Sequence, residues 1–136
     1  MFIISYLDTI KLYQLIQQLQ EEAPLQGGQV VSLLGNHEIM NLSGDWRYVS
    51  QGDIKTFGGV DERKKAFAPE GWIGRDLVGK NLTAKVGTSV FVHGGIHPSF
   101  AQGGVEDINL KTRQTILGYV ESRGRYDPHK VFGGRY

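Results

Sequence analysis

The stretch that decides the fold runs from residue 30 to residue 38 and reads Val-Val-Ser-Leu-Leu-Gly-Asn-His-Glu. Its first five residues are mostly apolar and predict a buried strand, which Gly35 then ends. In an open α/β sheet, ligands collect just beyond the carboxyl ends of the strands. Asn36, His37 and Glu38 are therefore expected at a site, because an amide oxygen, an imidazole and a carboxylate can bind a metal ion or carry a proton.

The same residues also have a purely structural interpretation. Asn36 would cap the next helix, Glu38 would favour the helix dipole and His37 would be partly buried. A second stretch, residues 88–96, favours a site because it repeats the plan: Thr-Ser-Val-Phe-Val-His-Gly-Gly-Ile is a β-prone run, then His93, then two glycines. Glycines let the backbone approach a ligand closely. We therefore hypothesise that two strand ends bring histidines to one site.

These residues resemble those of a known family. Gly-Asn-His-Glu at residues 35–38, followed by His-Gly-Gly at residues 93–95, is similar to the GNHE and HGG motifs of the calcineurin-like metallophosphatases, in particular the phosphoprotein phosphatases. Residues 91–98 and the Gly-Trp-Ile-Gly of residues 71–74 most resemble the Shewanella-like protein phosphatase branch. The resemblance implies an α/β fold, part of the metallophosphatase α/β sandwich in which central β-sheets are flanked by helices.

The resemblance also implies a chemistry and a set of site residues. Members of the family hydrolyse phosphate monoesters by in-line attack of a metal-bound hydroxide, and the branch is similar to protein Ser/Thr phosphatases. Asn36 and His93 would be metal ligands, His37 would be the catalytic proton donor, and Glu38 would support them from behind. The cofactors would be divalent metal ions, two in the family fold, with manganese, iron and zinc all suitable. The substrate would be a phosphorylated protein or a small phosphate ester.

The chain departs from the family pattern in three respects. The aspartate-bearing GDxH and GDxxDRG motifs do not precede the first predicted helix, no GH motif follows the last one, and His129 lies in a different context. Leu34 stands where many phosphoprotein phosphatases have a phosphate-binding arginine. We therefore expect residues 1–136 to be a single, partial calcineurin-like phosphoesterase domain. The alternative function is a catalytically inactive fragment or degenerate copy that acts as a binding module.

Composition and charge bear on three further properties: nucleic-acid binding, membrane insertion and the types of metal ligand. A net charge of +1, with 21% charged residues, does not indicate a nucleic-acid-binding surface. The apolar residues 1–7 are too few to span a bilayer and lack the features of a secretory signal. We expect a soluble, cytoplasmic protein that binds neither nucleic acid nor membrane. The chain has no cysteine, so any metal ligands must be His, Asn, Asp or Glu.

Periodicity and turn residues predict the remaining elements, which are a helix from Asp8 to before Pro24, a helix over 61–67, a turn over 69–75, a hairpin of 81–85 and 88–92, and a helix over 105–119. Asp8 is predicted to cap the first helix and not to bind metal. His97 is expected near the site without being a ligand. Arg75 is expected either to bind phosphate or to stack on Trp72 or pair with an acid.

Overall fold

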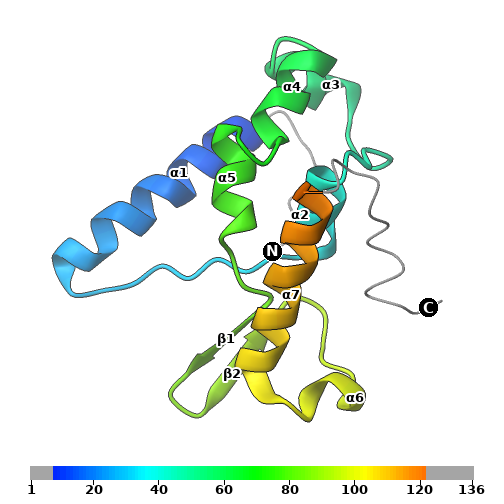
Figure 1. The fold of residues 1–136 in the computed structure, drawn as a ribbon. Helices are drawn as coiled ribbons and strands as arrows, with labels where there is room; N and C mark the ends of the chain where they lie inside the picture. Colours follow the sequence, from blue (N-terminus) through cyan, green and yellow to red (C-terminus); the bar gives the residue numbers. More distant parts are fainter. Residues whose placement is uncertain (1–7, 122–136) are drawn as a thin grey trace.

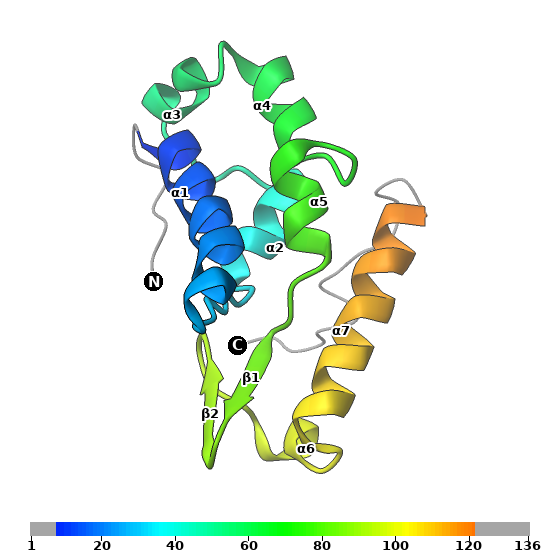
Figure 2. The same ribbon diagram turned by 90° about the vertical axis from the view of Figure 1, so that its left-hand side faces the viewer.

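The computed structural model describes residues 8–121 of the chain. Its elements are, in order, α1 (Thr9–Glu22), the 3-10 turn η1 (Ala23–Gln26), α2 (Asn36–Leu42), α3 (Gln51–Thr56), α4 (Val60–Phe67), α5 (Trp72–Val78), β1 (Thr83–Val86), β2 (Ser89–Val92), α6 (Pro98–Ala101) and α7 (Gly104–Glu121). The α3 and α4 helices lie at one end of the molecule, and the hairpin and α6 lie at the other (Figures 1 and 2). The fold is thus mixed, with a two-stranded sheet within the described residues, and the α/β sandwich stays a prediction.

The first helix is confirmed from Thr9 to Glu22, and it projects from the body of the molecule in Figure 1. Its inner end is anchored by Tyr13, which is buried and packs edge-on against Phe67 with ring centroids 5.8 Å apart. The prediction of a capping side chain was wrong. Asp8 occupies the N-cap position but makes no hydrogen bond to the helix amides there, and its carboxylate accepts one from Lys11 at 2.9 Å instead.

The core draws on five parts of the chain that are distant in sequence. Its fully or almost fully buried apolar residues are Tyr13, Leu34, Ala66, Phe67, Ile73, Leu77 and Ile116. Each large side chain of this kind contributes about 1.5–3 kcal/mol when it is removed from water. Because Leu34 is among them, with no exposed surface, the core fixes the backbone immediately before the Gly-Asn-His-Glu motif.

The buried strand predicted for residues 30–34 is not formed. The segment makes one isolated parallel bridge, between Leu33 and Asn81, in which the Leu34 N–H donates to the Asn81 carbonyl at 2.9 Å. Val31 is 49% exposed, so the run is not buried as a whole. A strand needs a continuous ladder with a neighbour, and among residues 8–121 the segment forms only this one bridge. Its direction toward the site is nevertheless set by that one bond.

The turn predicted over residues 69–75 is wrong for its second half, which forms α5. Gly71 takes the N-cap position and Ile73 and Leu77 bury one face of the helix in the core. Gly74 is required because a Cβ there would collide with the backbone carbonyl of Ala68. The glycines that suggested a turn are therefore close-packing positions between α4 and α5. The short α3, which the sequence did not predict, is capped by Ser50, whose hydroxyl accepts from the Asp53 N–H at 3.1 Å.

The predicted hairpin is confirmed. The strands pair antiparallel with Thr83 opposite Val92 and Val86 opposite Ser89, and the bend contains Gly87 at a φ of 59°, which favours glycine. All of β2 before Val92 is exposed, whereas Thr83 is 1% exposed. Thr83 is held by α7: the Asn109 side chain accepts from its amide at 3.1 Å and donates to its carbonyl at 3.0 Å. The hairpin is therefore tied to the body at its root.

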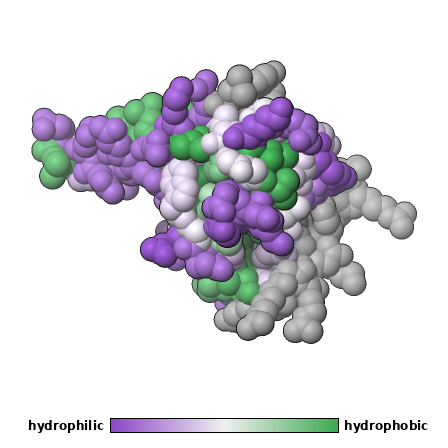
Figure 3. Space-filling model, turned by 90° about the horizontal axis from the view of Figure 1, so that it is seen from above, coloured by the Kyte–Doolittle hydropathy of each residue, from purple (hydrophilic) through white to green (hydrophobic). Residues whose placement is uncertain are grey.

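The surface seen from the α3 and α4 end is largely hydrophilic, with apolar residues in separate small areas (Figure 3). Within residues 8–121, no helix has the length and apolar character needed to cross a bilayer.

Candidate metal-binding and catalytic site

The two predicted metal ligands lie in contact. Asn36 begins α2, His93 follows β2, and the Asn36 Oδ1 and His93 Nε2 atoms are 3.1 Å apart although 57 residues separate them in sequence. Two backbone links explain the meeting. Asn81 holds Leu34 by a hydrogen bond, and β1, which begins just after it, pairs with β2 up to Val92. The chain leaving each segment therefore arrives at the same place, as the sequence predicted.

Gly35 packs against the His93 ring of this contact. A Cβ at Gly35 would lie 3.0 Å from both Cγ and Cε1 of His93, so the imidazole packs directly over the glycine backbone. Glu38 closes the other side, because its Oε2 accepts a hydrogen bond from the Gly35 N–H at 2.8 Å. This bond satisfies one amide at the beginning of α2 in the manner of a capping box. The Gly-Asn-His-Glu motif is thus a helix start as well as a set of site residues.

His37 lies on the first turn of α2 and is half-buried. Its carbonyl accepts from the Asn41 side chain at 2.9 Å. Its ring packs against Tyr48, with centroids 5.4 Å apart and planes inclined by 55°. In the part of the chain that the structure describes, no hydrogen bond holds the His37 ring, so Tyr48 is the contact that restrains it. The sequence analysis missed Tyr48, since nothing in its spacing from His37 indicates a contact.

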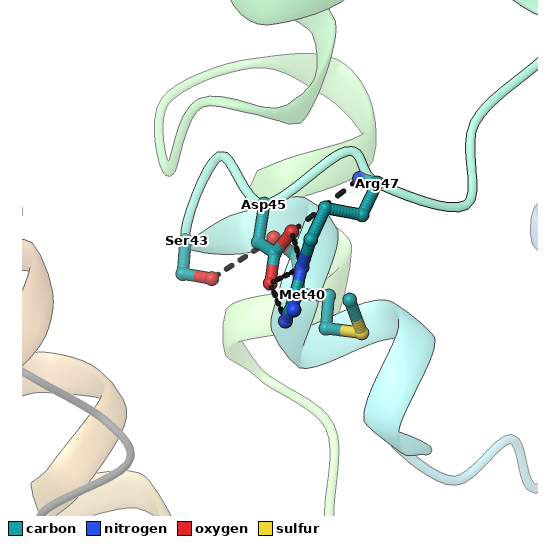
Figure 4. Close-up of polar contacts among 4 residues, drawn as sticks. All are labelled: Met40, Ser43, Asp45 and Arg47. Atoms are coloured by element: carbon teal, nitrogen blue, oxygen red, sulfur yellow. Dashed lines mark hydrogen bonds and ion pairs between the residues drawn. The ribbon is translucent and has the colours of Figure 1, made fainter.

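Tyr48 lies at the end of a turn formed by residues 43–48. Asp45 and Arg47 form a two-pronged ion pair within this turn (Figure 4). Arg47 donates from Nε to Asp45 Oδ1 at 2.9 Å and from Nη2 to Asp45 Oδ2 at 2.7 Å. These hydrogen bonds raise the pKa of the Arg47 guanidinium above its usual value. The Asp45 amide donates to the Met40 carbonyl at 2.8 Å, which joins the turn to α2.

A buried arginine, Arg63, packs against Trp46 of the same turn. Arg63 and Asp53 are both fully buried and their side chains form a bond of 2.9 Å. The Arg63 guanidinium lies 4.9 Å from the Trp46 ring centroid and 4.4 Å from that of Phe67. Its removal from water lowers the pKa of Arg63, and the hydrogen bond that Arg63 donates to the Asp53 carboxylate opposes that change. Trp46, two residues before Tyr48, is thereby packed against a charged group that cannot leave the core.

The distance between the two donor atoms fits a shared metal ion. Ligands bound at about 2.1 Å and at right angles to each other are about 3.0 Å apart, close to the 3.1 Å between Asn36 Oδ1 and His93 Nε2. The same atoms form a direct hydrogen bond when Nε2 carries the proton. Within residues 8–121, no group of three or more His, Asp or Glu side chains is placed to hold a metal. The described residues therefore bring together two atoms that could bind a metal ion, and their metal binding stays a prediction.

The other polar candidates lie elsewhere or have other partners. Arg75 donates to the Glu70 carbonyl at 3.0 Å, and the predicted partner acid, Asp76, pairs with Lys80 at 2.8 Å. His97 caps α6, where its Nδ1 accepts from the Ser99 amide at 3.3 Å. A hollow of about 490 Å³ between α1, residues 29–32 and the end of α5 is lined in part by Arg75 and Lys80 and not by the predicted site residues. His129 lies outside the described residues.

Two of the proteins that the chain is similar to carry phosphatase names. Shewanella-like protein phosphatase 2 of Arabidopsis thaliana is 31% identical over 93% of the chain, and Shewanella-like protein phosphatase 1 of Plasmodium berghei is 33% identical over 77% of it. The chain is related to protein phosphatases. A crystal structure of a cold-active protein tyrosine phosphatase at 1.1 Å shares the fold, with a TM-score of 0.67 and 29% identity over 78% of the chain. No protein-family model matches the sequence.

The match to these phosphatases covers only part of each of them. The chain spans 43% of the Arabidopsis protein, 30% of the Plasmodium protein and 32% of the tyrosine phosphatase chain. The structural match shows that the backbone fold of the aligned part of the chain also occurs in the tyrosine phosphatase.

Proposed function

We propose that the chain belongs to a metal-dependent phosphoesterase of the calcineurin-like superfamily, which hydrolyses phosphate monoesters of proteins or small molecules. The observation that carries the proposal is the contact between Asn36 and His93, whose donor atoms lie 3.1 Å apart. These residues come from two motifs that resemble those of the superfamily, and the phosphatase names of the relatives support the same reaction class.

Asn36 and His93 would hold one divalent ion through an amide oxygen and a ring nitrogen, a donor pair that suits manganese, iron or zinc. When bound, such an ion lowers the pKa of water and neutralises charge on the phosphoryl oxygens. His37 would give a proton to the leaving oxygen, because an imidazole changes charge near neutral pH. Gly35 and Glu38 would keep the two ligands in register by fixing the start of α2 and the seat of the His93 ring.

The second candidate is a binding module without turnover. It is favoured by the number of ligands, since residues 8–121 present no group of three or more His, Asp or Glu side chains around a metal position. Leu34, which is fully buried where many phosphoprotein phosphatases have a phosphate-binding arginine, does not separate the two functions, because the resemblance implies that the Shewanella-like branch tolerates this change. Such a module would bind a phosphorylated partner and release it unchanged.

Two measurements on the full chain separate these functions: a calorimetric titration with Mn²⁺ and the hydrolysis of p-nitrophenyl phosphate in its presence. For the phosphoesterase, His37→Ala lowers the turnover rate by about 10²–10⁴, the usual contribution of general acid catalysis. Asn36→Ala and His93→Ala weaken Mn²⁺ binding. His97→Ala is the matched control, because this exposed histidine bonds to Ser99 and to neither ligand, and it should change neither quantity. Absence of both stoichiometric Mn²⁺ and turnover would leave the binding module.

A further inference from the structure

We propose that Tyr48 is a positioning residue that holds the His37 imidazole in one orientation, and that the turn formed by residues 43–48 is built to present it. The inference rests on the proposed function in so far as His37 is the proton donor. It concerns a residue outside both motifs, reached by the chain only after α2 has ended.

The first observation is that the His37 ring packs against the Tyr48 ring. Its ring is half-buried, and within residues 8–121 none of its nitrogen atoms is held by a hydrogen bond. A histidine side chain with such freedom samples several rotamers on a fast timescale. Tyr48 covers it with a centroid distance of 5.4 Å and an inclination of 55°, within the range of favourable aromatic pairs. The contact therefore selects among the orientations of the imidazole.

The second observation is that Tyr48 lies on a hydrogen-bonded turn although the residue is 61% exposed. The Asp45–Arg47 fork closes the turn from one side. The Val49 amide donates to the Trp46 carbonyl at 3.0 Å, so the backbone around Tyr48 is itself hydrogen-bonded. Bidentate pairs between arginine and a carboxylate fix geometry as well as contributing energy.

The third observation is that the turn is attached to the body at two places. At its start, the Ser43 hydroxyl and the Asp45 amide both donate to the Met40 carbonyl of α2, at 2.9 and 2.8 Å. Further on, the Trp46 ring lies 4.9 Å from the buried Arg63 guanidinium. These contacts hold the turn against α2, and Tyr48 packs on His37 in the first turn of the same helix.

The test measures the rotamer of His37 directly, by side-chain coupling constants and ring-to-ring NOEs in the isotopically labelled full chain. We expect one rotamer and NOEs to the Tyr48 ring in the native chain and in Tyr48→Phe, which keeps the ring and removes the hydroxyl. In Tyr48→Ala the couplings should average over more than one rotamer. Trp72→Ala, which removes another exposed ring at the start of α5, is the control and should leave His37 unchanged. A single His37 rotamer in Tyr48→Ala would overturn the inference.

Kinetics provide the second readout. With p-nitrophenyl phosphate and Mn²⁺, Tyr48→Ala should lower kcat about 10- to 100-fold, the effect of misplacing a reacting group by about 1 Å, while KM changes little. Tyr48→Phe should restore kcat, which a hydroxyl-dependent role would not allow. If His37→Ala leaves turnover unchanged, the proposed function fails. If His37→Ala lowers turnover but Tyr48→Ala does not, the positioning role alone fails.

Discussion

Replacing Gly35 by alanine tests whether the two motifs are packed as the structure describes. The backbone is extended at this residue, with a φ of −109°, so alanine is allowed there without strain. The new Cβ would lie 2.8 Å from Glu38 Oε2 and 3.0 Å from two atoms of the His93 ring. Ordinary contact begins at 3.4 Å, so the ring must withdraw by about 0.4 Å. The carboxylate that accepts the Gly35 N–H must move as well.

The size of the effect follows from two opposing contributions. Adding a methyl group to a packed position costs about 1–3 kcal/mol of folding free energy. Alanine also restricts the unfolded chain, which stabilises the fold by about 0.4–1 kcal/mol. The net loss expected for Gly35→Ala is therefore about 0.5–2.5 kcal/mol. Gly79→Ala gives the second contribution alone, because a Cβ at Gly79 meets its nearest atom at 3.6 Å with a φ of −80°.

Urea denaturation of the native chain and of both variants measures the two contributions, and a Mn²⁺ titration measures the effect on the ligands. We expect the free energies of unfolding of Gly79→Ala and Gly35→Ala to differ by about 1–3 kcal/mol. Mn²⁺ affinity should fall about 10- to 100-fold in Gly35→Ala, as when a residue that supports a metal ligand is altered. Equal stabilities and equal Mn²⁺ affinities in the two variants would refute the packing of His93 on Gly35.

Three further predictions concern the body of the molecule. Asp53→Ala leaves the Arg63 charge buried without its carboxylate, so the free energy of unfolding measured by urea denaturation should fall by about 3–5 kcal/mol. Adding Arg63→Met should recover much of this stability. Losses that add in the double variant would contradict the prediction. Burial raises the pKa of the Tyr13 phenol above its ordinary value of 10.0, so the unfolded chain releases this proton at a lower pH than the folded chain does. The free energy of unfolding should therefore fall as pH rises above 10, by up to about 1.4 kcal/mol per pH unit. Tyr13→Phe should remove this pH dependence, and identical pH profiles of the native chain and the variant would contradict the prediction. Asn109→Ala leaves the Thr83 amide and carbonyl without their buried partners, at about 1–3 kcal/mol for each group, and hydrogen exchange at the Thr83 amide should accelerate.

The sequence predicted best what depends on local pattern. Apolar spacing located α1 and α7, and Gly87 located the hairpin bend. The contact between Asn36 and His93 agrees with the family resemblance, which implies that both residues bind one metal ion. The interpretation of these residues as metal ligands stays a prediction.

The errors arose where tertiary contacts decide the local structure. Gly71 and Gly74 indicated a turn, but Gly74 is the point at which α5 approaches the backbone of Ala68. The apolar run before Gly35 indicated a strand, but a strand requires a partner ladder, and apolar residues alone do not provide one. Tyr48 could not be linked to His37 because the turn between them is set by a charged fork and by a buried arginine.

The hydrogen bonds between α7 and β1 have a consequence for His93, which follows the neighbouring strand β2. Asn109 grips the Thr83 backbone, Thr83 faces Val92 across the hairpin, and His93 is the next residue along. The position of the His93 backbone therefore depends on α7. A small molecule or partner that shifted α7 along its axis would displace His93 relative to Asn36 without entering the site.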